Sequence, residues 1–277
     1  MTDAPTTIGF IGAGNMAGSL IGGLIADGVA PQTLWAADPN AERLTALGVA
    51  DGLQLTTDNR AVAEAADVLV LAVKPQVVRA VLEGLRAPLA ARRPLVISVA
   101  AGVRLEALRR WAGCDLPLVR AMPNTPALVQ SGATALVAGP HVDRALRNRA
   151  ESVMRAVGMV LWLDDEAQMD AVTALSGSGP AYFFLLMEAI QRAGERLGLP
   201  AETARLLTLE TAFGAAKMAL ESDVDAATLR ARVTSPGGTT ERAVGVLIEQ
   251  NFEEIMYQAL SAAAARSREL ADILGGE

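Results

Sequence analysis

Residues 6–20 read TTIGFIGAGNMAGSL, and this stretch decides the fold. A short apolar run suited to a buried strand gives way to glycines and then to apolar residues at helical spacing. Gly12, Gly14 and Ala17 follow the pattern G-x-G-x-x-G/A, which between a strand and a helix is typical of dinucleotide-binding sites. Gly12 can take a backbone conformation that side chains disfavour, and Gly14 lets the main chain approach a pyrophosphate. The alternative is a glycine turn that only connects the strand to the helix.

The alternation of strand-like and helix-like segments that starts there continues to about residue 163. Helix-like segments such as 15–28 and 76–86 alternate with short runs that are continuously apolar, as expected for strands covered on both faces. The candidate strands are TIGFIG, TLWAAD, DVLVLAV, PLVISVA, LVRAM, ATALVA and MVLWLD. Strand and helix in alternation predict an α/β domain at residues 1–163, a Rossmann-type doubly wound parallel sheet that binds a dinucleotide.

Residues 164–277 have a different sequence pattern, because long helical patterns replace the β-branched runs. These patterns cover 180–197, 201–221, 225–233 and 239–272. The segment AYFFLLMEAI is apolar nearly all round, so a solvated satellite is a poor explanation for this half. We expect an all-helical domain that forms a homodimer or a larger assembly, with a compact monomeric bundle as the alternative.

Composition narrows the class of protein. The net charge of −7 disfavours a nucleic-acid partner or a basic membrane face. The apolar runs are too short to span a bilayer. The single cysteine, Cys114, allows no internal disulfide, and the single histidine, His141, rules out the usual His-rich metal sites. We expect a cytoplasmic protein that binds no metal.

Asp38 ends the second candidate strand, 24 residues beyond Gly14. An acidic residue there typically accepts hydrogen bonds from the adenosine ribose and repels a 2′-phosphate, which favours NADH over NADPH. The alternative is that Asp38-Pro39-Asn40 is turn chemistry ahead of the next helix. Arg60, at the same end of the fold, could still offer charge to a phosphate.

Several later stretches are distinctive beyond any propensity. They are VLAVKPQ (70–76), VISVAAGV (96–103), VRAMPNTPALV (119–129), LSGSGPAY (175–182), GAAKM (214–218) and TSPGGTTERAV (234–244). In this order and spacing, from residue 8 to about 270, the chain resembles the Δ1-pyrroline-5-carboxylate reductase family. The resemblance implies NAD(P)H-dependent reduction of L-1-pyrroline-5-carboxylate to L-proline, a helical dimerisation domain and often a ring of dimers.

The resemblance also implies site residues. The cofactor contacts it implies are Ile11, Gly12, Ala13, Gly14, Asn15, Met16, Asp38, Asn59, Ala72, Val73, Lys74, Pro75, Val99, Ala100 and Ala101. Family members commonly carry a small hydroxyl or an arginine-bearing turn near position 38, so the aspartate here is a departure that puts a preference for NADPH in doubt. On the substrate side the resemblance implies Gly238, Thr239, Thr240 and Glu166, with Thr240 and Ser235 as catalytic residues.

The stretch SPGGTTER suits a carboxylated cyclic imine. Pro236 and two glycines leave backbone N–H groups exposed where a helix begins, which favours an anion. The hydroxyl of Thr240 is expected to contact the ring nitrogen and to orient an imine that arrives protonated. The plain alternative is a Pro-Gly turn before a helix. Ser176 and Ser178 help to shape the pocket, or belong to a flexible break ahead of Pro180.

Two other functions compete with this interpretation. A β-hydroxyacid dehydrogenase of the same architecture needs a lysine on the helical half, where only Lys217 could serve. A non-catalytic NAD(P)-binding dimer would have no need of the second anion site at SPGGTT.

Overall fold

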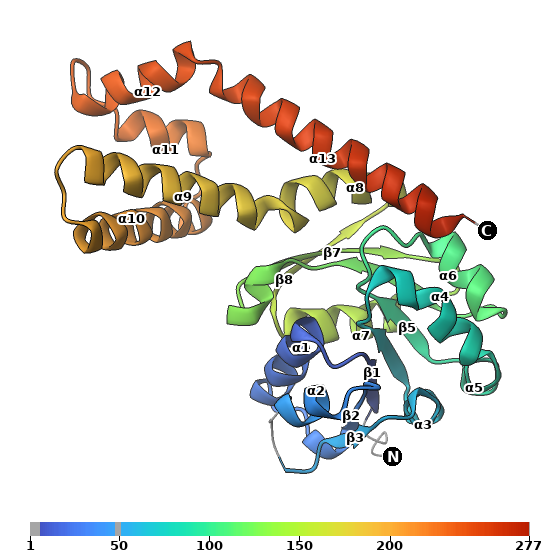
Figure 1. Ribbon diagram of the computed structural model, residues 1–277. Helices are drawn as coiled ribbons and strands as arrows, with labels where there is room; N and C mark the ends of the chain where they lie inside the picture. The colour runs from blue at the N-terminus through green and yellow to red at the C-terminus, as the bar shows by residue number, and fades with distance from the viewer. Residues whose placement is uncertain (1–5, 48–50, 277) are drawn as a thin grey trace. The chain divides into compact units, whose positions relative to one another are not determined.

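A computed structural model describes residues 6–47 and 51–276 (Figure 1). The chain divides into two compact units. The described residues of 1–178 and 263–277 form the first unit, and residues 179–262 form the second. Each unit has its own architecture.

Among the described residues of the first unit, eight strands form one sheet in the order β3-β2-β1-β4-β5-β6-β7-β8. The bounds are β1 Ile8–Ile11, β2 Leu34–Ala37, β3 Gln54–Thr56, β4 Val68–Leu71, β5 Leu95–Ser98, β6 Leu118–Met122, β7 Gly132–Ala138 and β8 Gly158–Leu163. Neighbours from β3 to β6 are parallel, β7 is antiparallel to β6, and β8 is parallel to β7. The order reverses between β1 and β4, which is the switch point at which doubly wound sheets bind ligands.

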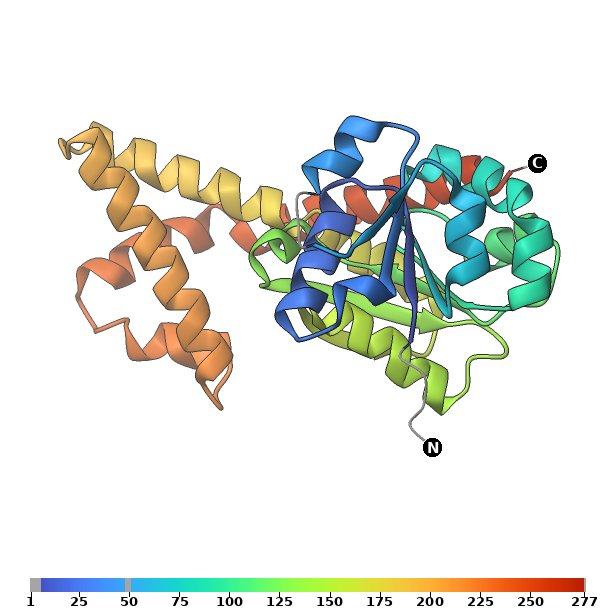
Figure 2. The ribbon, with the colours of Figure 1, turned by 90° about the horizontal axis from the view of Figure 1, so that it is seen from below.

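Helices cover both faces of this sheet. Their bounds are α1 Asn15–Ala26, α2 Ala41–Ala46, α3 Asn59–Ala65, α4 Pro75–Gly84, α5 Arg86–Arg92, α6 Leu105–Ala112, α7 Arg144–Arg155 and α8 Met169–Val172. The 3-10 turns are η1 Pro31–Thr33, η2 Thr125–Val129 and η3 Glu166–Gln168, and η4 Thr173–Gly177 is a π-helical turn. The helices α1, α2 and α7 bury one core with alternate strand residues such as Val68 and Val70, while α3 to α6 bury the other with Leu69 and Leu71. In Figure 2 the blue α1 and the teal α4 to α6 lie on opposite sides of the strands. The predicted Rossmann-type doubly wound sheet is confirmed.

Two details of the sheet differ from the prediction. Strand β3 was not expected, because Gln54–Thr56 is a short, partly exposed edge strand without an apolar run. The sheet is also not wholly parallel. Only a short segment with the 3-10 turn η2 joins β6 to β7, and such a connection returns the chain antiparallel because a parallel partner needs a longer crossover.

The division between the units falls between Ser178 and Gly179, later than the predicted boundary after residue 163. The cause is packing. Met169 of α8 is fully buried with Ala135 and Val137 of β7, which holds the segment after β8 on the first unit.

The second unit is all-helical. It contains α9 Gly179–Arg196, α10 Ala201–Glu221, α11 Ala226–Arg232, α12 Thr239–Glu249 and the first part of α13 Phe252–Gly275. The single helix predicted over 239–272 is therefore two, because Asn251 adopts a left-handed conformation with φ 55°. No helix among the described residues is long and apolar enough to cross a membrane.

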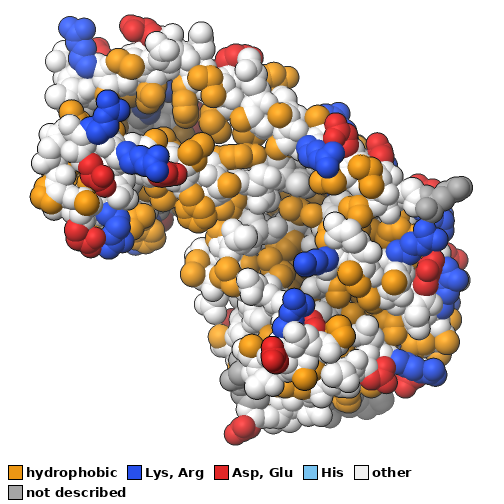
Figure 3. Space-filling view, viewed as in Figure 1, with side chains coloured by type: hydrophobic (Ala, Val, Ile, Leu, Met, Phe, Trp, Pro, Cys, Tyr) orange, Lys and Arg blue, Asp and Glu red, His pale blue; other side chains and the backbone are white. Residues whose placement is uncertain are grey.

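Large apolar side chains are exposed on this unit. Phe183, Phe184 and Phe213 are 64–65% exposed, and Tyr257 is 68% exposed. Figure 3 shows apolar side chains gathered over these helices, in the upper left of the view. Apolar exposure on this scale marks an interaction surface.

The last part of α13 belongs to the first unit. There the hydroxyl of Ser267 donates to Asp170 Oδ1 over 2.6 Å. Arg104 pairs with Asp272 at 2.8 Å, and Arg110 Nη2 donates to the carbonyl of Gly275 over 2.5 Å. The helix thus continues through the boundary between the units.

Candidate functional site

The glycine loop follows β1 at the carboxyl edge of the sheet. The N–H of Gly12 donates to the carbonyl of Ala37 over 2.7 Å, and that of Ala72 donates to Ile11 over 2.8 Å. Gly12 has φ 99°, and a Cβ placed on it would lie 2.6 Å from the carbonyl oxygen of Ala72. Only glycine fits this position without strain.

Gly14 is glycine for a different reason. It is the N-cap of α1, no side chain caps the helix there, and a Cβ on Gly14 would meet no atom within 4 Å. Asn15 and Met16 begin the first turn, whose N–H groups have no intrahelical partner. Open space in front of uncapped N–H groups fits a pyrophosphate. The loop formed by residues 11–16 therefore fits a dinucleotide.

Asp38 is 4% exposed and is bound to its own fold. Its Oδ2 accepts the N–H of Ala13 at 3.0 Å, and its Oδ1 accepts that of Asn40 at 2.9 Å. Arg43 lies 3.7 Å from Oδ2 with its side chain 58% exposed. Turn chemistry is thus present, and the carboxylate also ties the end of β2 to the glycine loop. Arg43 is the basic group beside Asp38, and it was not foreseen from the sequence.

The other residues predicted on the adenosine side differ in their partners. Asn59 begins α3, and its Oδ1 is a buried acceptor without a hydrogen-bond partner among the described residues, so a ligand donor could satisfy it. Arg60 is already paired with Glu64 at 2.7 Å, and this hydrogen bond raises the pKa of Arg60.

Two further predicted segments follow neighbouring strands. Residues 72–75 follow β4, with Lys74 as the N-cap of α4 and Pro75 as its first residue. Residues 99–101 follow β5, and the N–H of Val99 donates to the carbonyl of Leu71 over 3.2 Å. Because parallel strands end at one edge, the sheet places these segments in a row with the glycine loop and Asp38.

The predicted substrate loop lies in the second unit, at the start of α12. Gly237 has φ 70°, and the N–H of Gly238 donates to the carbonyl of Ser235 over 3.0 Å. Gly238 is the N-cap of α12 without a capping side chain, and Thr239 and Thr240 form the first turn. Glu241 Oε2 accepts the N–H of Gly237 at 2.8 Å. The helix therefore begins with uncapped N–H groups beside two hydroxyls, an arrangement that can bind a carboxylate.

Glu166 belongs to the first unit, whereas the 235–240 loop belongs to the second. Its Oε1 accepts from Arg120 Nη1 at 2.8 Å and from the N–H of Leu105 at 2.9 Å. The side chain of Arg120 is 5% exposed, so Glu166 balances a buried charge. This ion pair was not foreseen.

The stretch MPNTP contains a contact that sequence reasoning missed. The Nδ2 of Asn124 lies 3.2 Å from the hydroxyl oxygen of Ser176 and 3.3 Å from its carbonyl oxygen. The Oδ1 of Asn124 accepts the N–H of Ala133 at 2.9 Å. The distinctive sequences of MPNTP and SGSGP indicated that both stretches have a functional role. They gave no indication that Asn124 and Ser176 are in contact.

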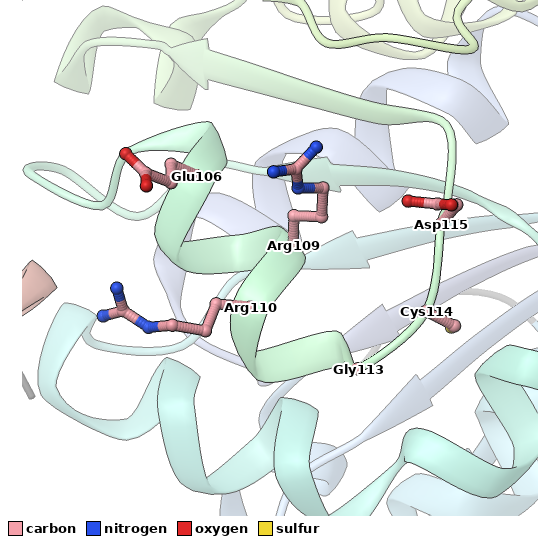
Figure 4. A pocket seen from close by; sticks show the side chains of 6 residues that line it. All are labelled: Glu106, Arg109, Arg110, Gly113, Cys114 and Asp115. Carbon is pink, nitrogen blue, oxygen red and sulfur yellow. The ribbon is translucent and has the colours of Figure 1, made fainter.

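A hollow of about 460 Å³ lies elsewhere on the first unit (Figure 4). Its lining is Glu106, Arg109, Arg110, Gly113, Cys114 and Asp115. It is lined by α6 and by the segment that leads from α6 to β6. This segment lies at the amino edge of the parallel strands, which is the edge opposite the glycine loop. Partial burial raises the pKa of the Cys114 thiol, which makes Cys114 a poor nucleophile.

Two other predicted features can be placed. The side chain of Lys217 is 58% exposed and lies 3.8 Å from Glu221 on the same helix, an ordinary surface pair that gives no support to the β-hydroxyacid dehydrogenase reading. Within 6–47 and 51–276, no group of three or more His, Cys, Asp or Glu is placed to hold a metal ion.

Comparison with known proteins matches both halves of the chain. Residues 7–102 match the family described as NADP oxidoreductase coenzyme F420-dependent, and residues 166–270 match Pyrroline-5-carboxylate reductase dimerisation. A pyrroline-5-carboxylate reductase of Pseudomonas aeruginosa is 53% identical over 97% of this chain and 98% of its own length.

Solved structures agree with these matches. The structure of a pyrroline-5-carboxylate reductase from Coxiella burnetii has a TM-score of 0.92 at 48% identity, covering 96% of this chain and 99% of its own. The pyrroline carboxylate reductase of Plasmodium falciparum, solved with NADP bound, has a TM-score of 0.83 at 28% identity, covering 96% and 98%.

Proposed function

The chain belongs to the pyrroline-5-carboxylate reductase family, and we propose that the glycine-loop edge and the 235–240 loop are the cofactor and substrate sites of its reaction. The protein is an NAD(P)H-dependent oxidoreductase that reduces L-1-pyrroline-5-carboxylate to L-proline, the last step of proline biosynthesis. The observation that carries this conclusion is the 53% identity along nearly the full length of both chains.

The cofactor side is formed by the row of residues along the carboxyl edge. Gly14 and the first turn of α1 are suited to bind the pyrophosphate, and Asn59 offers a buried acceptor on the adenosine side. Residues 72–75 and 99–101 line the other half of the edge. NAD(P)H, when bound there, supplies the hydride.

The substrate side is formed by the start of α12. The uncapped N–H groups after Gly238 are suited to the carboxylate of the imine, with Ser235 and Thr239 beside them. Thr240, half-buried in the first turn, orients the ring nitrogen through its hydroxyl and is the catalytic contact. Glu166 was predicted beside the ring. Its ion pair with Arg120 favours a supporting role.

The test is turnover of the purified protein with pyrroline-5-carboxylate and each cofactor. Thr240→Ala should lower kcat about 100-fold, the scale of a lost proton-handling group, with cofactor affinity nearly unchanged. Thr240→Ser is the matched control, because it keeps the hydroxyl, and it should retain most of the rate. Equal rates in the wild type and Thr240→Ala would remove Thr240 from the mechanism.

For the choice between cofactors, we propose a preference for NADH. Asp38 places a buried carboxylate at the end of β2, where a 2′-phosphate would meet negative charge. The neighbouring guanidinium of Arg43 works against this preference. In Asp38→Ser the ratio of kcat/KM for NADH over NADPH should fall. A ratio that stays the same or rises contradicts the proposal.

The helical unit belongs to a dimerisation domain, and the protein forms a dimer. Its exposed aromatic side chains suit burial against a second copy. We further propose a ring of dimers, a cytoplasmic location, and a functional boundary near residue 164, which the family match beginning at residue 166 supports. Light scattering should give a multiple of the dimer mass; a mass of twice 28.8 kDa limits the assembly to a dimer.

A further inference from the structure

The MPNTP stretch and the SGSGP stretch meet next to the cofactor edge. Asn124 lies two residues beyond the end of β6, and Ser176 lies in the π-helical turn η4. π-Helical turns are rare and frequently occur at functional sites. The turn is closed by the N–H of Ser178, which donates to the carbonyl of Thr173 over 2.8 Å.

The position of this turn is fixed from two sides. Asn124 donates to both oxygens of Ser176, and its own Oδ1 is held by the N–H of Ala133, which sets which way the amide faces. A Cβ on Gly177 would lie 2.4 Å from the methyl group of Met122, so the turn rests directly on the end of β6. Side chains at the end of β6 and just after it therefore locate Ser176.

The contact also orients the hydroxyl of Ser176. Its oxygen accepts a hydrogen from Asn124, and an amide nitrogen offers no acceptor in return. Among the described residues the hydroxyl of Ser176 donates to no other group, so its hydrogen can be donated to a ligand. Ser176 is only half-buried, so a ligand can reach it.

The sheet order shows which part of the cofactor comes near. Along the carboxyl edge Asp38 follows β2, the glycine loop β1, residues 72–75 β4, residues 99–101 β5 and Asn124 β6. A dinucleotide with its adenosine at β2 and its pyrophosphate at β1 would extend its nicotinamide toward β4, β5 and β6. Ser176 therefore lies at the nicotinamide end of the same unit.

We propose that Ser176 donates its hydroxyl hydrogen to the carboxamide oxygen of the nicotinamide, and that Asn124 is the positioning residue that holds it there. The inference rests on the proposed cofactor site. Fixing the carboxamide fixes the rotation of the ring, and with it the direction from which the hydride leaves.

The experiment compares the normal cofactor with its thionicotinamide analogue, in which the carboxamide oxygen is sulfur and accepts hydrogen bonds poorly. Ser176→Ala should lower kcat with the normal cofactor about tenfold, the value of one lost hydrogen bond of about 1.4 kcal/mol. With the donor gone, the preference for the oxygen over the sulfur cofactor should also fall, both in kcat and in the dissociation constant measured by titrating each cofactor into the protein without the imine. Ser131→Ala is the control, because its exposed hydroxyl donates only to the carbonyl of Val129 among the described contacts, and both values should match the wild type.

Asn124→Asp tests the positioning role, because it keeps an acceptor for the N–H of Ala133 and removes the donor to Ser176. The double variant with Ser176→Ala should be no slower than the slower single variant, since both act through one hydroxyl. If Asn124→Asp does not fold, the ratio measured on Ser176→Ala decides alone.

An unchanged oxygen-to-sulfur ratio in Ser176→Ala, or losses that multiply in the double variant, would overturn the inference. A higher KM for the imine with that ratio unchanged would assign the hydroxyl to the substrate and would also overturn it. Wild-type turnover is measured in the same series. Failure of the proposed function would appear there and is distinct from failure of this inference.

Discussion

The two loops proposed to bind anions begin helices of similar length but are supported differently. The loop at residues 11–16 precedes the 12-residue α1, and the loop at residues 235–240 precedes the 11-residue α12, each with an uncapped glycine at the N-cap. The first loop is held by residues distant in sequence, such as Asp38, which accepts from Ala13. The second is held from within, by Glu241 four residues from Gly237.

The difference shows where each loop gets its shape. The sheet on which the first loop lies imposes its conformation, so a ligand has little ordering to do there. The second loop is mostly exposed and depends on local contacts, so its order is easier to change. In the first loop, a substitution that clashes with the sheet should therefore cost much stability, and one that faces open space should affect binding alone. In the second loop, substitutions should affect both stability and binding, weakly.

The largest effect is expected for Gly12→Ala. The new methyl group would lie 2.6 Å from a backbone oxygen at a φ of 99°, and the sheet cannot yield easily. We expect a loss of about 3 kcal/mol in the free energy of unfolding, at the upper end for a strained backbone position, together with loss of cofactor binding. Urea unfolding measures it. A stability within error of the wild type would show that the sheet does not impose the loop's shape.

Gly14→Val should separate folding from binding. Its side chain enters open space, so the melting temperature should hold, whereas affinity for the cofactor should fall about 100-fold, or about 2.7 kcal/mol, because the pyrophosphate needs that space. Cofactor fluorescence titration and thermal unfolding measure the two quantities. Gly22→Ala, in open space on the same helix, is the control and should bind normally.

Substitutions of Glu166 test whether this residue stabilises the first unit through Arg120 or binds the substrate. Glu166→Ala leaves Arg120 buried without its partner, and we expect a loss of about 2 kcal/mol in stability, below the full value for a buried pair because Glu166 is 28% exposed. Glu166→Gln keeps an acceptor for Leu105 and Arg120 and should lose less. Stability held in both variants, with a higher KM for the imine, would instead make Glu166 a substrate residue.

The smallest effect is expected for Glu241→Ala. It removes the acceptor for the N–H of Gly237, and we expect about 0.5–1 kcal/mol lower stability. KM for pyrroline-5-carboxylate should rise severalfold, because the loop is less ordered before it binds. Steady-state kinetics beside Glu241→Gln, which keeps the acceptor, measures it. No change in KM would mean that the loop is ordered by other contacts.

Much of the fold could be predicted because short local sequence patterns determine many of its strands and helices. The glycine loop and the buried run at Val68–Leu71 need only their neighbours in sequence to be recognised. Strand β3 escaped because an exposed edge strand carries no apolar run, and the direction of β7 because pairing is settled in space. The break at Asn251 was missed because a single asparagine within an apolar helical pattern is a weak signal.

The site follows the same division. Gly12 and Gly14 could be singled out from the motif alone, and the structure explains each by what a Cβ would meet. The link between Asn124 and Ser176 joins residues 52 apart, and that between Arg120 and Glu166 joins residues 46 apart. Such partners emerge only once the chain is folded, since no local pattern encodes them.

The course of α13 has a consequence for anyone who cuts this protein into pieces. A fragment ending at residue 178 would lack the helical segment that lies against Gly102 and pairs with Arg104 and Arg110. A fragment starting at residue 179 would carry that segment with nothing to receive it. If the chain is cut there, each fragment should aggregate when it is alone. The two fragments should fold together when they are mixed.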